Sequence, residues 1–156
     1  MISKGKKFET KFNKDWNKSF PQGFIYRLPD QLTGYKVTSR NPCDFIGFNN
    51  NTLYLIECKS HKGASLPMSN ITQYDNLKKK VGIPGVRSGV VLWLYEKDKV
   101  FYIPAKTLVK MKEEDGEKSV GLRHVGKYRM IEIPSEKKRV FMDSDYSTLL
   151  SLEDGD

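Results

Sequence analysis

The chain has 156 residues, of which 27 are Lys or Arg and 19 are Asp or Glu, giving a formal net charge of +8. It contains no run of 18 apolar residues, which excludes a transmembrane helix, and its charged N-terminus lacks the apolar segment of a signal peptide. We therefore expect a single cytoplasmic domain over 1–156, with residues 153–156 as a frayed acidic tail. Such a basic domain often binds a polyanion, above all nucleic acid, although a merely soluble basic surface is the alternative.

Residues 1–20 predict an amphipathic helix at the N-terminus. Phe8, Phe12 and Trp16 recur at the i, i+4, i+8 spacing of one helix face, amid Lys and Asn. Ser3 is a suitable N-cap. Glu9 lies at the edge of the apolar stripe, where it is either a solvated helix acid or an additional carboxylate at a site on the neighbouring sheet.

Residues 24–28 then predict a strand, followed by a polar loop that projects from the fold. The loop, a short stalk over about 31–41, contains Gly34 and the basic residues Lys36 and Arg40. A β-hairpin follows, because the apolar runs 45–48 and 52–56 flank Asn49-Asn50-Asn51, a turn-forming cluster that tolerates left-handed backbone.

The hairpin predicts a group of three charged residues on one face. Side chains alternate along a strand, so Glu57 and Lys59 share a face and Cys58 points to the other. If Asn50-Asn51 is the loop, Asp44 lies directly opposite Glu57, and if all three Asn form the loop the two carboxylates are diagonal neighbours. Opposed carboxylates repel unless a cation lies between them, and two hard oxygen donors suit Mg²⁺ or Mn²⁺.

The two cysteines are expected on the other side of the hairpin. We expect Cys43 and Cys58 to lie close together there, as reduced thiols of a cytoplasmic protein. With His61 and His124 they lack the ligand spacing of a zinc finger, which argues against a zinc site.

The rest of the chain predicts alternating helices and strands. Ser69 or Asn70 can cap a helix to about Lys80 with Gln73 just off its apolar stripe, and 88–95 predicts a central buried strand. Further expected elements are a loop over 60–69, a strand over 100–103, a helix over 104–112, a last strand over 128–133 and a short helix over 146–152. This order predicts an α/β fold with a central mixed sheet flanked by helices.

One Glu-x-Lys triplet differs from the others in its context. The pattern occurs at Glu9, Glu57 and Glu136, but only Glu57-Cys58-Lys59 ends an apolar strand that follows a Pro-x-Asp. Pro42-Cys43-Asp44 and Glu57-Cys58-Lys59 resemble the signature of the PD-(D/E)xK nucleases. Within that superfamily the chain is similar to the RecU Holliday junction resolvases of Gram-positive bacteria and their phages.

The resemblance to RecU covers roughly residues 5 to 120. It includes the stretches Gly5–Glu9, Asp44–Gly47, Ser65–Met68, Val100–Pro104 and Lys118–Val120, together with Gln73. There are two departures: Thr72 precedes Gln73 where the family usually has a His, and the connection over about 31–41 is shorter than the family's stalk. The compact length suggests a phage-encoded member.

The resemblance implies a role for each residue of the site. Asp44, Glu57 and the carbonyl of Cys58 would hold Mg²⁺, for which Mn²⁺ would substitute, and Lys59 would orient water or stabilise negative charge. Glu9 would assist through a metal-bound water, and Gln73 would position the nucleophile or Lys59. The DNA-binding candidates are the basic residues near the site: Arg27, Lys36, Arg40, Lys62 and Lys118.

The implied function is resolution of four-way DNA junctions by a homodimer, since paired nicks need two active sites. Two alternatives remain open from the sequence. The same nuclease fold could cut ordinary duplex or flapped DNA, or the chain could be a non-catalytic DNA-binding or strand-annealing protein of recombination.

Overall fold

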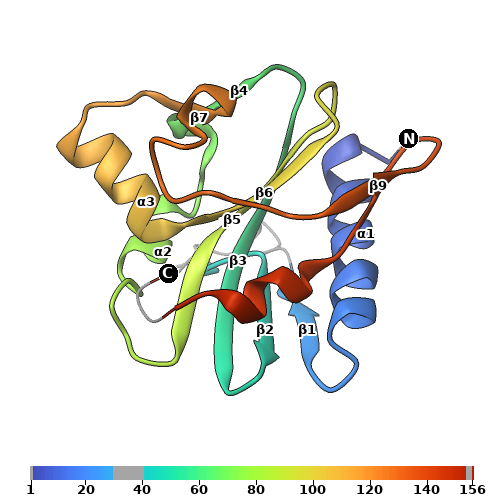
Figure 1. Cartoon of the computed structure of the whole chain (residues 1–156). Coiled ribbons are helices and arrows are strands. Elements are labelled where there is room, and N and C mark those ends of the chain that lie inside the picture. The colour runs from blue at the N-terminus through green and yellow to red at the C-terminus, as the bar shows by residue number, and fades with distance from the viewer. Residues whose placement is uncertain (1, 30–40, 154–155) are drawn as a thin grey trace, which may run out of the picture.

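A mixed β-sheet with helices on both faces organises the protein (Figure 1). The structure is a computed structural model that describes residues 2–29, 41–153 and 156. Within these residues the largest sheet has six strands in the order β1-β2-β3-β5-β6-β8. The strands are β1 Phe24–Arg27, β2 Phe45–Asn49, β3 Thr52–His61, β5 Val86–Leu94, β6 Lys99–Pro104 and β8 Ile131–Glu132. Only β3 and β5 pair in parallel, so the sheet is mixed, which confirms the expected fold class.

Helix α1 (Lys4–Ser19) covers one face of the sheet (Figure 1). It begins at Ser3, whose hydroxyl accepts a hydrogen bond from the Lys6 N–H at 3.2 Å, as predicted for an N-cap. Phe12 and Trp16 are fully buried, and the ring of Trp16 packs against Tyr54 of β3. A 3₁₀ helix, η4 (Tyr146–Ser151), lies beside α1, where a short helix over 146–152 is predicted.

The opposite face carries α2 (Tyr74–Lys78) and α3 (Ala105–Val109), and α3 continues into a π-helical turn over Lys110–Glu114. Between these helices and the sheet lies a second apolar core, to which Val90 and Leu92 of the fully buried end of β5 contribute. The central buried strand and the helix after Pro104 are therefore confirmed. None of the described helices is long and apolar enough to span a membrane.

The β2–β3 hairpin has the shorter of the two loops that the sequence left open. Asn49 pairs with Thr52 and Phe45 pairs with Ile56, so the loop consists of two residues. Asn50 and Asn51 have φ angles of 48° and 60°. Positive φ at both central positions defines a type I′ turn, whose twist matches that of the flanking strands.

The crossover from β3 to β5 differs from its prediction. It contains β4 (Ser65–Pro67), which pairs with β7 (Ser119–Gly121), and a 3₁₀ turn, η1 (Met68–Asn70). The helix predicted to begin at Ser69 or Asn70 begins only at Tyr74. Thr72 and Gln73 lie between η1 and α2, and their N–H groups donate to the side chain of Glu57.

The C-terminal part is also more irregular than predicted. The strand expected over 128–133 is reduced to β8, and a small antiparallel pair follows, β9 (Ser135–Lys137) with β10 (Met142–Ser144). This pair is tied to α1 by polar groups: Asp15 accepts from the Ser144 N–H, and Lys11 donates to Asp143. Of the expected acidic tail, Asp156 forms an ion pair with Arg129.

The two cysteines do not share a face, which corrects the prediction. Cys58 packs in the core beneath α1, whereas Cys43 packs in the core on the side of α2 and α3. The reason is that β2 begins only at Phe45, so strand alternation does not extend back to Cys43. Both are free buried thiols, and burial raises the pKa of each.

Candidate active site

Glu57 is the centre of the candidate site. It lies on β3, and its side chain is fully buried although it carries a carboxylate. Oε1 accepts hydrogen bonds from the N–H and the hydroxyl of Thr72, at 3.1 and 2.8 Å, and Oε2 accepts from the N–H of Gln73 at 3.1 Å. Buried charges persist only when they are well hydrogen-bonded or paired, and here the crossover supplies the donors.

Lys59 lies beside Glu57, as the strand period predicts. Its Nζ is 3.2 Å from Glu57 Oε1, and its side chain is about one quarter exposed, at 26%. The side chain is therefore partly exposed to solvent, while its ammonium group is held against the carboxylate. That position suits a cation which meets developing negative charge on a substrate.

Asp44 lies one residue before β2, directly across the hairpin from Glu57. Its Oδ2 accepts a hydrogen bond from the Cys58 N–H at 3.0 Å. Burial raises the pKa of Asp44 to about 6, and the charges of Glu57 and Glu9 act in the same direction. The Cys58 N–H and Lys59 oppose this rise without cancelling it. The structure thus brings Asp44, Glu57 and Lys59 together as predicted.

Glu9 faces the same region from α1, but it is already paired. Its Oε2 accepts a hydrogen bond from Arg27 Nε of β1 at 2.7 Å and lies 3.7 Å from Lys6 Nζ. Arg27, expected among the DNA-binding residues, also donates to the carbonyl of Leu28. Its guanidinium is thereby engaged in fixing Glu9, whose charge contributes to the raised pKa of Asp44.

Gln73 reaches the site through its main chain. Its N–H donates to Glu57, whereas its side-chain Oε1 accepts from Asn76 Nδ2 at 3.0 Å. Gln73 therefore lies at the site as predicted, but it contacts Glu57 through its backbone N–H and not through its side chain. Sequence reasoning missed Thr72, which appeared only as a departure from the family pattern. The signal that could have found it was a hydroxyl residue directly before Gln73, at a point where the helix was expected to be regular.

The remaining basic candidates lie around this region or outside the described residues. Lys62 is an exposed residue just beyond β3 and lies 3.9 Å from Glu96. Lys118 is exposed, and its carbonyl accepts from the Met68 N–H, which places it beside the crossover. The stretch 31–40, with Lys36 and Arg40, is not among the described residues.

The oxygen donors of the site fit a hard divalent cation. Among the described residues, no group of three or more His, Cys, Asp or Glu side chains is arranged to hold a metal ion. The expected ligands form a different set: the carboxylates of Asp44 and Glu57 and the main-chain carbonyl of Cys58. Hard oxygen donors are those that Mg²⁺ prefers. Among the described residues, most hydrogen bonds to these two carboxylates are accepted by Asp44 Oδ2 and Glu57 Oε1. The second oxygen of each carboxylate therefore has few protein donors.

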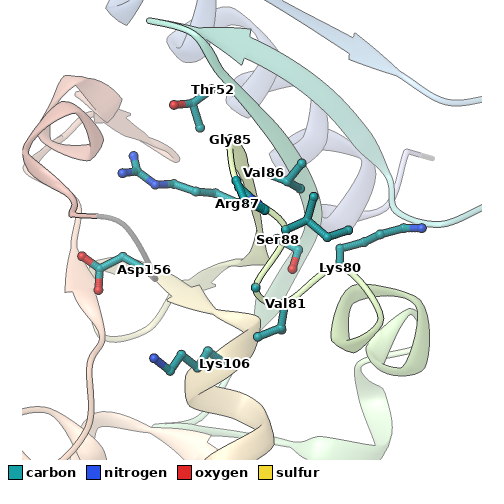
Figure 2. Close-up of a pocket in the computed structure, with 12 residues that line it drawn as sticks. Thr52, Lys80, Val81, Gly85, Val86, Arg87, Ser88, Lys106 and Asp156 are labelled. Atoms are coloured by element: carbon teal, nitrogen blue, oxygen red, sulfur yellow. The ribbon is translucent and has the colours of Figure 1, made fainter.

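A separate pocket lies near the other ends of β3 and β5 (Figure 2). Its lining includes Thr52, Val86, Arg87, Lys106 and Asp156. Thr52 opens β3, so the pocket lies about 17 Å along the strand from Glu57. In Figure 2 the side chain of Arg87 extends from β5 towards the C-terminal segment, where it donates to the carbonyls of Leu149 and Leu152. This pocket therefore does not belong to the carboxylate site.

Comparison with known proteins finds similarity in structure but not in sequence. No protein-family model and no curated protein matches the sequence. Among solved structures, the chain is similar to Hjc, a Holliday junction resolvase from the archaeal hyperthermophile Archaeoglobus fulgidus. The TM-score is 0.57 at 21% sequence identity, and the match covers 80% of this chain and 93% of that chain. The protein therefore has a fold like that of Hjc, a mixed sheet flanked by helices.

Proposed function

We propose that the protein is a Mg²⁺-dependent, structure-selective DNA endonuclease that resolves Holliday junctions by paired nicks during recombination. The observation that carries this proposal is the juxtaposition of Asp44, just before β2, with buried Glu57 and Lys59 of β3 in an Hjc-like fold. In a hairpin with no functional role, two neighbouring carboxylates would only reduce stability, because like charges repel each other. The net charge of +8 supports a polyanionic substrate.

The residues of the site divide the chemistry between them. Asp44, Glu57 and the Cys58 carbonyl would hold Mg²⁺ or Mn²⁺, which would polarise the scissile phosphate and lower the pKa of a bound water. Lys59, fixed against Glu57 Oε1 and partly exposed, would stabilise the charge that develops on the phosphate. Glu9, held by Arg27, adds negative charge near Asp44 and so favours a cation there.

The proposal also covers the type of enzyme, its origin, its location and its oligomeric state. We propose a RecU-like enzyme of phage origin that acts in the host cytoplasm as a homodimer, since symmetric cleavage of a four-way junction requires two sites. Thr72 stands where the RecU family usually has a His before its glutamine, so this chain departs from the family pattern at that position.

The test is cleavage of matched duplex, flapped and four-way DNA by the full chain in Mg²⁺. We expect junction cleavage that falls by about 10²–10³-fold or more in Asp44→Asn and Lys59→Ala, while both variants still bind the junction in Mg²⁺-free buffer. Glu136→Ala is a matched control because Glu136 belongs to another Glu-x-Lys triplet, is exposed and pairs only with the surface residue Lys138 among the described residues.

Two outcomes would count against the proposal. Equal cutting of plain duplex would remove junction selectivity and favour a general nuclease. Loss of binding in place of cleavage in Asp44→Asn would favour a non-catalytic DNA-binding protein. Phosphate contacts dominate such binding, so affinity is expected to fall steeply with salt concentration in either case.

A further inference from the structure

Thr72 makes a contact that its position at the surface does not explain. It lies between η1 and α2 and is exposed, yet both its N–H and its hydroxyl donate to Oε1 of the fully buried Glu57. The hydroxyl contact, at 2.8 Å, is the shortest hydrogen bond to this carboxylate among the described residues.

The hydroxyl does not serve the helix that follows. The N-cap of α2 is Gln73, and no side chain makes a capping hydrogen bond there. A threonine at this point could have stabilised α2 by accepting a hydrogen bond from one of its first N–H groups. Instead Thr72 Oγ1 acts as a donor to Glu57.

The donors divide unequally between the two oxygens of Glu57. Oε1 accepts two hydrogen bonds from Thr72 and lies 3.2 Å from Lys59 Nζ. Oε2 accepts only the N–H of Gln73 among the described donors. The terminal torsion of a glutamate is broad, so a carboxylate without donors would adopt many orientations. Three donors around one oxygen fix the orientation of the carboxylate plane.

We propose that Thr72 is a positioning residue of the active site: it fixes the Glu57 carboxylate so that Oε1 holds Lys59 and Oε2 stays available to a divalent cation. The inference rests on the proposed nuclease function and adds to it a residue that does not touch the substrate.

The experiment compares Mn²⁺ binding by wild type, Thr72→Val and Thr72→Ser, measured by isothermal titration of the full chain with MnCl₂. Valine keeps the shape and the N–H but lacks the hydroxyl, and serine restores the hydroxyl. We expect Thr72→Val to bind Mn²⁺ about 10-fold more weakly, as for other residues that orient metal ligands, and Thr72→Ser to bind as wild type does.

Thr107→Val is the matched control. Thr107 lies on α3, and its hydroxyl donates to the Arg129 carbonyl, away from the carboxylates. We expect Thr107→Val to lose thermal stability and keep its Mn²⁺ affinity, whereas Thr72→Val should lose Mn²⁺ affinity in addition to the stability that its hydrogen bond to buried Glu57 provides. Junction binding in Mg²⁺-free buffer should stay unchanged in both.

The outcomes separate this inference from the proposed function. If wild type binds Mn²⁺ and cleaves junctions but Thr72→Val binds Mn²⁺ equally well, the positioning role is wrong and the nuclease remains. Equal weakening in Thr72→Ser and Thr72→Val would also overturn it, because the hydroxyl would then not be responsible. If wild type neither binds Mn²⁺ nor cleaves DNA, both proposals fail.

Discussion

Asp44 and Glu57 are neighbours across a hairpin, but their carboxylates have different surroundings. Glu57 is surrounded by donors from Thr72, Gln73 and Lys59, which offset the cost of burying its charge. Asp44 accepts one N–H and lies near two other carboxylates, so its charge is poorly compensated. Buried carboxylates near like charges prefer the protonated form, which explains the direction of its pKa.

This difference predicts that Asp44→Asn stabilises the protein in the absence of divalent cations. The pKa of Asp44 is about 6 in the folded state, above its ordinary value of 3.8. The stability associated with its proton is therefore fully present below pH 3.8 and is lost as pH rises through 6. At pH 8 we expect Asp44→Asn to be more stable by about 1–2 kcal/mol, allowing for solvent screening at this half-buried site. Urea unfolding at pH 8 and pH 4 checks this, because the difference should vanish at the lower pH.

Asp143→Asn provides the control of opposite sign. The hydrogen bond from Lys11 lowers the pKa of Asp143, so its contribution to stability is present at neutral pH and is lost as pH falls. This variant should be less stable than wild type at pH 8. If both variants shifted in the same direction, the assignment of Asp44 as a destabilising charge would be contradicted.

Sequence reasoning at this scale succeeded where contacts are periodic. The period of two along β3 placed Glu57 beside Lys59, and the hairpin placed Asp44 opposite them. Thr72 could not be predicted in the same way, because its contact with Glu57 depends on an irregular turn in the crossover. The pairing of Arg27 with Glu9 was also missed, since it joins α1 to β1 and follows no local period.

At the scale of elements, the hairpin and the crossover show what local sequence can and cannot determine. The β2–β3 turn was predicted because two Asn residues can adopt positive φ with little cost. The helix over 70–80 was predicted to start too early because its apolar stripe, Ile71, Tyr74 and Leu77, is buried as expected whether or not the first turn is helical. Periodicity reports the buried face, but it does not predict the irregular turn whose N–H groups donate to Glu57.

The turn predicts opposite effects for two substitutions. Asn51→Gly should stabilise the hairpin, because Asn-Gly is the preferred pair for a type I′ turn. Asn50→Val should destabilise the protein by about 1–2 kcal/mol, because a β-branched residue is strained at positive φ. Chemical unfolding measures both, with Asn51→Ala expected to be less stable than wild type. A reversed order would mean that the turn is not of type I′.

At the scale of the whole molecule, the sheet separates two apolar cores, and the C-terminal segment closes one of them. Tyr146 and Leu149 belong to this segment and are fully buried in the core shared with α1. Arg87 of β5 fixes the segment by donating to the carbonyls of Leu149, Leu152 and Glu153. The sequence predicted the sheet and its covering helices but not this closure, because the acceptors are main-chain carbonyls that any sequence possesses.

Arg87→Met should therefore loosen the C-terminal segment without affecting the carboxylate site. Methionine keeps much of the apolar stem but removes the hydrogen bonds from a charged donor, at a cost of about 2 kcal/mol. Hydrogen exchange should accelerate at the amides over 146–152, while Mn²⁺ binding should remain at the wild-type level because the site lies elsewhere along the strands. Unchanged exchange in that segment would show that packing of Tyr146 and Leu149 is sufficient to hold it.

The donation of three hydrogen bonds from the crossover to Glu57 also limits how the site could be transplanted. A hairpin of residues 44–59 grafted onto another protein would carry all three charged side chains of the candidate site. It would leave behind the donors of Thr72 and Gln73, and a buried carboxylate without donors is strongly disfavoured. A graft that keeps both the charged side chains and their donors must extend from Asp44 through Gln73 and include β5, the parallel neighbour of β3.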